Sequence, residues 1–144
     1  MKSWAEKNMS EKEINILQNI SLVYKKLPDE DLGNDKNGEK IPLAQCHILA
    51  RAFSDVFSLK YEDGFFFPNF EHSWLISPEG NVIDVYPVGI FSGPIIVFNK
   101  FKGPAQKLYI PSDERYFIER TGKSEFDEAV RKAITIINTI KSQL

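Results

Sequence analysis

Three side chains in this sequence can together carry out covalent catalysis: Cys46, His72 and Asp84. In such a set a thiolate attacks a carbonyl carbon, an imidazole takes up and returns the proton, and a carboxylate orients the imidazole. Cys46 is the only cysteine of the chain, so it is either a packed apolar side chain or a nucleophile. The residue types therefore predict acyl-transfer chemistry, provided that the fold brings the three together.

Residues 71–87 predict a β-hairpin that places His72 beside Asp84. Pro78 suits the second position of a type I turn, and Gly80 suits the left-handed position that closes a three-residue loop. With this loop His72 and Asp84 lie on the same face, one diagonal step apart, whereas a two-residue turn would place them on opposite faces. The expected cross-strand pairs are Ser77 with Asn81, Leu75 with Ile83, and Trp74 with Asp84.

Asp84 is the one charged residue in an otherwise apolar strand, Val82–Tyr86. A carboxylate buried there is costly unless it is paired. We therefore expect His72 to be its partner. The carboxylate would hold one ring nitrogen of His72, which fixes the tautomer and leaves the other nitrogen free to act as a base.

Residues 42–57 predict a buried helix that begins at Pro42 and carries Cys46 in its first turns. The partial positive charge of the helix N-terminus favours thiolate over thiol at this place. Because free cysteines are among the most buried residue types, a structural Cys46 is the alternative. His47 points about 100° away around the helix. We expect it to be a surface or hydrogen-bonded core histidine, neither a base nor a metal ligand.

The remaining segments predict a helix at each end of the chain and an antiparallel sheet between them. Ser10 and Glu13 form a capping box before a helix that Pro28 ends, and a C-terminal helix begins near Ser124. This order gives an α+β fold with a central antiparallel sheet packed against the cysteine-bearing helix. The other expected features are a solvated loop at 29–40, turns at 60–64, 87–94 and 101–104, and strands at 65–70, 95–98, 107–111 and 115–118.

Length and composition restrict the class of protein. The chain has 144 residues, 42% of them hydrophobic and 12% aromatic, which predicts one domain, 1–144, with one core. A net charge of −2 without a basic cluster argues against nucleic acid or an anionic membrane as partner. No segment approaches the roughly 18 apolar residues of a membrane span, and the N-terminus lacks an apolar signal core. We expect a soluble, cytoplasmic protein without cofactor or metal; the residues do not predict an oligomeric state.

The segment from Pro42 to Pro87 resembles the transglutaminase-like branch of the papain-like cysteine enzymes. Members of that superfamily carry a helix cysteine, a His-x-Trp strand and a later Asp, often followed closely by Pro, on an α+β fold. This chain has Cys46, His72-Ser73-Trp74 and Asp84-Val85-Tyr86-Pro87 in that order. The resemblance implies a transglutaminase-like core in which Cys46 is the nucleophile, His72 the general base and acid, and Asp84 its orienting partner. The chain lacks a tryptophan or a glycine-rich stretch beside the cysteine, and Gln45 is its candidate oxyanion donor.

The leading functional prediction is a thiol hydrolase that cleaves peptide or amide bonds in protein substrates. Transamidation, glutamine deamidation and amine acyl transfer use the same triad and differ in the acceptor that reaches the thioester. A different class of protein, a non-catalytic binding or immunity-type module, would keep the fold with the three residues in structural roles. A metal site built from the same three residues is a weaker hypothesis, because their spacing matches neither CxxC nor HxxxH.

Overall fold

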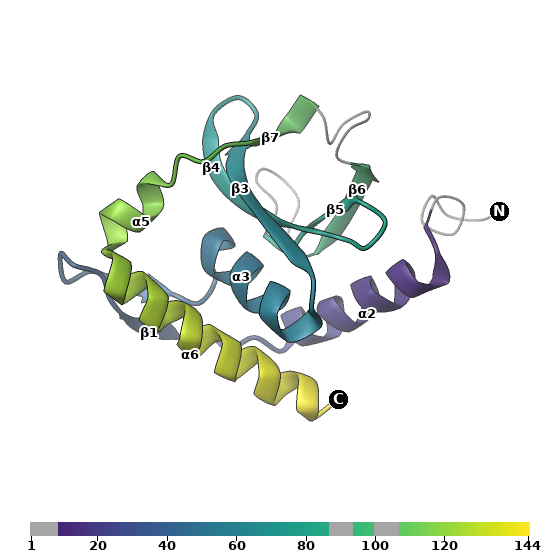
Figure 1. Cartoon of the computed structure of the whole chain (residues 1–144). Helices are drawn as coiled ribbons and strands as arrows, with labels where there is room; N and C mark the ends of the chain where they lie inside the picture. The colour runs from purple at the N-terminus through teal and green to yellow at the C-terminus, as the bar shows by residue number, and fades with distance from the viewer. Residues whose placement is uncertain (1–8, 87–93, 100–106) are drawn as a thin grey trace.

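The computed structural model describes residues 9–86, 94–99 and 107–144 of the chain. In this part, four helices accompany a curled five-stranded antiparallel sheet and a separate two-stranded hairpin (Figure 1), which confirms the α+β class. The predicted turns at 87–94, apart from Pro94, and at 101–104 lie outside the described residues. The helices are α2 (Glu11–Lys25), α3 (Cys46–Phe57), α5 (Tyr116–Thr121) and α6 (Lys123–Ser142). The strands are β1 (Asp31–Asn34), β2 (Lys40–Pro42), β3 (Lys60–Phe66), β4 (Phe70–Ile76), β5 (Asn81–Asp84), β6 (Ile95–Asn99) and β7 (Tyr109–Pro111).

The large sheet has the strand order β6-β5-β4-β3-β7, and its neighbouring strands pair antiparallel. The β4–β5 hairpin has the predicted register, with Leu75 opposite Ile83. The N–H of Gly80 donates to the carbonyl of Ser77 at 2.9 Å, and Gly80 has a φ of +83°, the left-handed conformation that the loop requires. The three-residue loop is therefore confirmed, and with it the shared face of the two site residues on this hairpin.

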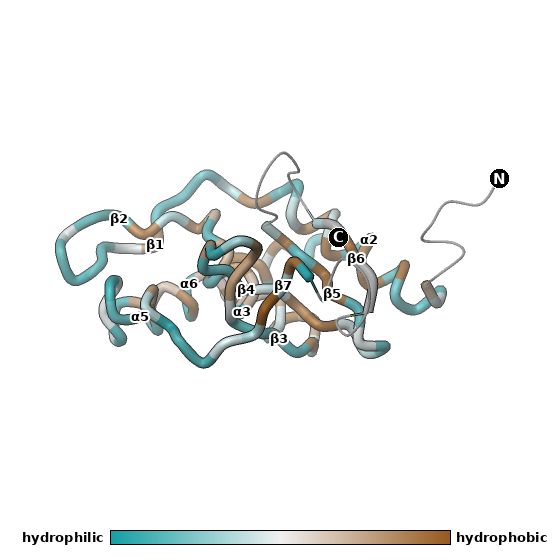
Figure 2. Tube along the Cα trace, turned by 90° about the horizontal axis from the view of Figure 1, so that it is seen from above, coloured by the Kyte–Doolittle hydropathy of each residue, from teal (hydrophilic) through white to brown (hydrophobic). Residues whose placement is uncertain are grey.

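Helix α3 is the centre of the molecule, between the large sheet and α6 (Figure 1). A helix that is apolar on most sides must be covered on most sides, and α3 has the sheet on one side and α6 on the other. Hydrophobic stretches gather in this middle region, whereas the loop between β1 and β2 is largely hydrophilic and lies at one end of the molecule (Figure 2). Helix α6 is buried here through Phe126, Ala133 and Ile137.

The segment predicted as a solvated loop, residues 29–40, instead contains β1 and leads into β2. Leu32 in β1 and Ile41 in β2 are buried in the main core, and Asp35 Oδ1 closes the turn between the strands by accepting hydrogen bonds from two backbone N–H groups. Pro42 ends β2, so the expectation of a helix beginning at Pro42 is wrong. Because the N–H of Leu43 donates to the Glu30 carbonyl, the chain is still held beside β1 there, and α3 begins only at Cys46.

Three other predicted boundaries are wrong. Residues 60–64 are the first part of β3 instead of a turn, because they pair with β4 along its whole length. The predicted aromatic strand at 65–70 is the end of β3, a turn and the start of β4. Residues 115–118 enter helix α5 instead of forming a strand. Helix α6 has Gly122 as its N-cap, with no side-chain cap from Ser124.

The first helix begins as predicted, with Ser10 Oγ accepting the Glu13 N–H at 3.2 Å. The Glu13 carboxylate does not complete the capping box. It is fully buried and accepts hydrogen bonds from Ser77 Oγ at 2.7 Å and Asn81 Nδ2 at 2.8 Å. This contact ties α2 to the turn of the β4–β5 hairpin. None of the described helices is long and apolar enough to cross a lipid bilayer.

Candidate active site

His72 on β4 and Asp84 at the end of β5 form a buried pair. Nε2 of His72 lies 2.7 Å from Oδ2 of Asp84, and both side chains are almost completely inaccessible. The carboxylate is fully satisfied, because Oδ2 also accepts the Tyr109 hydroxyl at 2.7 Å and Oδ1 accepts the Tyr86 N–H at 3.0 Å. The predicted partnership is confirmed. The carboxylate fixes the ring, so that Nδ1 is left for the thiol side.

Cys46 interacts with the same imidazole. Nδ1 of His72 is buried and makes no hydrogen bond, to sulfur or to any other atom, within the described part of the chain. Burial by itself would lower the pKa of His72, but the hydrogen bond to Asp84 and the interaction with the Cys46 thiol outweigh it and raise the pKa to about 9. The ring therefore interacts with both the carboxylate and the thiol and is protonated at neutral pH. The fold thus brings His72 against Asp84 and places Cys46 close enough to influence the pKa of the same imidazole.

The thiol adjoins a groove with a volume of about 770 Å³. Cys46 is the first residue of α3 and is 9% exposed, whereas His72 and Asp84 are not among the residues that line the groove. The thiol is thus the member of the set that a ligand in the groove meets first. The walls come from the β1–β2 turn, the start of α3, the end of β5 and helix α5, and include Asp35, Lys36, Glu39, Tyr86, Phe117 and Arg120.

The N-terminus of α3 offers hydrogen-bond donors next to the thiol. The first N–H groups of a helix have no intrahelical acceptor, and the N-cap residue Gln45 makes no side-chain cap hydrogen bond here. The amide of Gln45 also lines the groove, and its Oε1 is buried without a partner among the described residues. The start of the helix can therefore donate hydrogen bonds to an anion that develops beside Cys46.

His47 is the hydrogen-bonded core histidine that its position predicts. Its ring is 6% exposed, Nδ1 lies 2.8 Å from Ser73 Oγ, and one face stacks on Phe117 with the ring centroids 3.6 Å apart. Burial, followed by the charge of Arg51, lowers the pKa of His47 to about 3. It is therefore neutral at physiological pH and too weakly basic to compete with His72 for the thiol proton.

A metal centre does not form from the three site residues. Over residues 9–86, 94–99 and 107–144, no group of three His, Cys, Asp or Glu side chains is placed to hold a metal ion. The physical reason is that Asp84 already occupies Nε2 of His72, and its other hydrogen bonds come from a tyrosine and a backbone N–H.

Tyr109 on β7 is a site residue that the sequence does not identify. It lies in a short apolar strand, and nothing in that strand indicates that its hydroxyl meets a carboxylate 25 residues earlier in the chain. Burial, then the charge of Asp84, raises the pKa of Tyr109 well above its ordinary value, so the hydroxyl stays a donor. Tyr109 also packs edge-on against Trp74, with ring centroids 5.1 Å apart.

We expect Tyr109→Phe to keep this packing while removing one hydrogen bond to Asp84. The free energy of unfolding should fall by about 1 kcal/mol. The pKa of His72 should rise, because the carboxylate then concentrates its charge on the imidazole. Chemical denaturation measures the first effect and NMR titration of the imidazole the second. An unchanged pKa of His72 would show that Tyr109 is structural only.

No protein-family model, curated protein or solved structure matches this chain. The comparisons therefore assign it to no family. The resemblance to transglutaminase-like enzymes remains a prediction from the motifs around Cys46, His72 and Asp84.

Proposed function

We propose that this protein is a cysteine-dependent acyl-transfer enzyme that hydrolyses peptide or amide bonds in protein or peptide substrates. The observation that carries the proposal is that His72 is hydrogen-bonded to a buried carboxylate and also interacts with the thiol of Cys46. The thiol lines a groove that is open to a ligand. A structural histidine needs the carboxylate but has no need of a nearby thiol that lines a groove.

In this mechanism the proton of Cys46 has already passed to His72 in a resting pair of thiolate and imidazolium, and the sulfur attacks the substrate carbonyl carbon. The resulting oxyanion is stabilised by N–H groups at the start of α3 and by the amide of Gln45. The imidazolium then gives its proton to the leaving amine as the C–N bond breaks, which leaves a thioester on Cys46. Water attacks the thioester with His72 as base, so that the acid and the free thiol are released.

The acceptor decides the reaction within this class. Water gives hydrolysis or deamidation, whereas an amine gives transamidation or acyl transfer from the same thioester. Asp35, Lys36 and Arg120 on the groove walls provide charges of both signs. Such walls suit a polypeptide, which presents both charged side chains and backbone amides.

The rate at which Cys46 is alkylated by iodoacetamide tests the proposal. An ordinary cysteine, with a pKa of about 8.5, is almost wholly protonated at pH 6. Since the pKa of His72 is about 9, an imidazolium is present at pH 6 to stabilise the thiolate. We expect the folded protein to react at pH 6 at least about tenfold faster than the urea-unfolded chain.

The matched control is His72→Ala, in which the folded protein should no longer be alkylated faster than the unfolded chain. Turnover should also fall as the pH rises through about 9, because His72 then loses the proton that it must give to the leaving group. Slow alkylation of the folded wild-type protein at pH 6 would contradict the enzyme and favour the binding-module hypothesis.

A further inference from the structure

We infer that Nε2 of His47 is a hydrogen-bond acceptor that binds an N–H group of the substrate next to Cys46, and that it selects amides over substrates without such an N–H. This inference rests on the proposed acyl-transfer function and adds to it a specificity-determining residue. It is argued from a second buried network, which is separate from the pair formed by His72 and Asp84.

The network begins at a carboxylate that can only accept hydrogen bonds. Asp63 on β3 lies 2.7 Å from both Arg51 and Arg115. Burial alone would raise the pKa of Asp63, but hydrogen bonds from Arg51, Ser73 and Arg115 lower it below its ordinary value. Asp63 is therefore ionised at neutral pH.

Ser73 hydrogen-bonds to both Asp63 and His47, so the ionised carboxylate determines which ring nitrogen of His47 carries the proton. Its Oγ lies 2.6 Å from Oδ1 of Asp63 and 2.8 Å from Nδ1 of His47. A hydroxyl has one hydrogen, and an ionised carboxylate can only accept it, so Ser73 donates to Asp63. Its oxygen must then accept from His47, and the proton of the imidazole is placed on Nδ1.

The second ring nitrogen of His47 is therefore a lone-pair acceptor. The burial that lowers the pKa of His47 to about 3, aided by the charge of Arg51, keeps the ring neutral. The charged or titratable groups that act on this ring are Arg51, Asp63, His72 and Arg120. Of these four groups, Asp63 raises the pKa of His47, whereas burial and the other three groups lower it and together have the larger effect.

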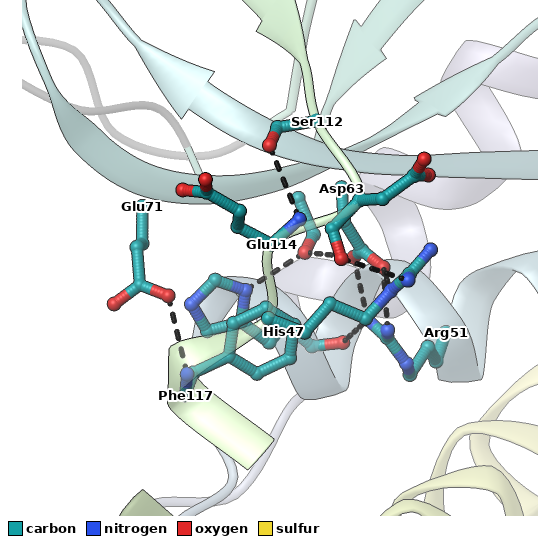
Figure 3. Close-up of polar contacts among 10 residues, drawn as sticks. His47, Arg51, Asp63, Glu71, Ser112, Glu114 and Phe117 are labelled. Carbon is teal, nitrogen blue, oxygen red and sulfur yellow. Dashed lines mark hydrogen bonds and ion pairs between the residues drawn. The ribbon is translucent and has the colours of Figure 1, made fainter. Parts of the chain in front are cut away.

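The acceptor is directed to the groove. One face of the imidazole is stacked on Phe117, the Nδ1 edge faces Ser73, and the other nitrogen points away from Asp63 (Figure 3). In the described part of the chain, only Gln45 Oε1 and His72 Nδ1 are fully buried side-chain polar atoms without a partner. Nε2 of His47 is not one of these atoms and has no hydrogen-bond partner in this part of the chain, and His47 lines the groove of Cys46.

Such an acceptor has a predictable preference. When a substrate fills the groove and excludes water, Nε2 must find a donor or remain unpaired, which is unfavourable. An amide with an N–H supplies that donor beside the scissile carbonyl, whereas an ester or a tertiary amide does not. Sites with a buried polar group that only the substrate can hydrogen-bond discriminate strongly against analogues that lack the complementary donor or acceptor.

Two alkylating agents test the inference: iodoacetamide, and N,N-dimethyliodoacetamide, in which methyl groups replace both N–H hydrogens, so that the His47 variants serve as the control for the difference in size. The rate of each with the folded protein is divided by its rate with the urea-unfolded chain, which removes intrinsic reactivity. We expect the wild-type protein to favour iodoacetamide by roughly three- to tenfold. His47→Asn should abolish the preference, because asparagine can still donate to Ser73 but has no acceptor at the Nε2 position. His47→Gln, which can place an amide oxygen there, should retain part of it.

The outcomes separate this inference from the proposed function. Rapid alkylation of Cys46 with the same reagent preference in wild type and His47→Asn would overturn the role of His47 and leave the acyl-transfer enzyme intact. Slow alkylation by both reagents would overturn the enzyme and the inference with it. Nitrogen-15 NMR of the wild-type protein is independent of any variant: we expect a neutral Nδ1–H tautomer of His47 that does not titrate between about pH 5 and 9. An Nε2–H tautomer or an imidazolium would overturn the inference.

Discussion

Cys46→Ala is expected to abolish turnover while leaving the fold nearly intact. The substitution removes the sulfur that forms the thioester, and loss of a nucleophile from a catalytic triad costs on the order of 10⁶-fold in rate. The cavity is small, because only one sulfur atom at the edge of the groove is lost, so the free energy of unfolding should fall by about 1 kcal/mol or less. Turnover of a peptide-amide library and chemical denaturation measure the two effects.

Cys46→Ser is the matched control, because it keeps a side chain of similar shape and a proton for His72. A hydroxyl is a much weaker nucleophile at neutral pH, so we expect it to be inactive as well. The wild-type protein should form a thioester adduct visible by mass spectrometry, and neither variant should. Full activity of Cys46→Ala would rule out covalent catalysis.

Asp84→Ala is expected to impair stability and activity together. It leaves His72, Tyr109 and the Tyr86 N–H without their common acceptor in a dry site. Removal of one partner from a buried charged pair typically costs about 3–5 kcal/mol. Without the carboxylate the imidazole is neither oriented nor stabilised as a cation, which should lower turnover by about 10²-fold or more.

The pH dependence of the free energy of unfolding shows whether the charged pair of His72 and Asp84 is the source of this stability. The pKa of His72 is raised from 6.5 to about 9 in the folded state. Its stabilisation is therefore fully present below pH 6.5 and is lost as the pH rises through about 9, a change of about 3 kcal/mol at about 1.4 kcal/mol per pKa unit. Chemical denaturation at several pH values should show this loss in the wild-type protein and not in Asp84→Ala.

Asp84→Asn is the milder companion of this variant. The asparagine oxygen can still accept the Tyr109 hydroxyl, so most of the stability should be kept, while the negative charge that favours the imidazolium is gone. We expect activity to fall in both variants and stability to fall mainly in Asp84→Ala. An active, stable Asp84→Ala protein would exclude a role for this carboxylate in the site.

The pairing of His72 with Asp84 was predictable because it depends on the turn and on the strands next to it in the sequence. Pro78 and Gly80 define a loop of three residues, and the loop length decides the face on which His72 and Asp84 lie. A carboxylate in an apolar strand also implies a nearby partner, whichever fold surrounds it. The helical spacing of apolar residues likewise predicts α2, α3 and α6.

Tertiary packing decided which other residues contact the pair of His72 and Asp84. Cys46 reaches His72 because α3 packs against β4. Tyr109 reaches Asp84 because β7 returns along the sheet to pair with β3, which places it near the β4–β5 hairpin.

The groove walls also depend on packing, and here the secondary structure predicted from local sequence was wrong. The segment at 29–40 has the polar composition of a loop, yet two buried residues anchor it as a hairpin beside the thiol. Residues 115–118 look like a strand, yet they enter the short helix that places Phe117 against His47. Sequence by itself determined the hairpin pair and the main helices, because turn geometry and periodicity act over a few residues. Only the tertiary structure decided which thiol, hydroxyl and groove meet that pair, because those contacts join elements far apart in the chain.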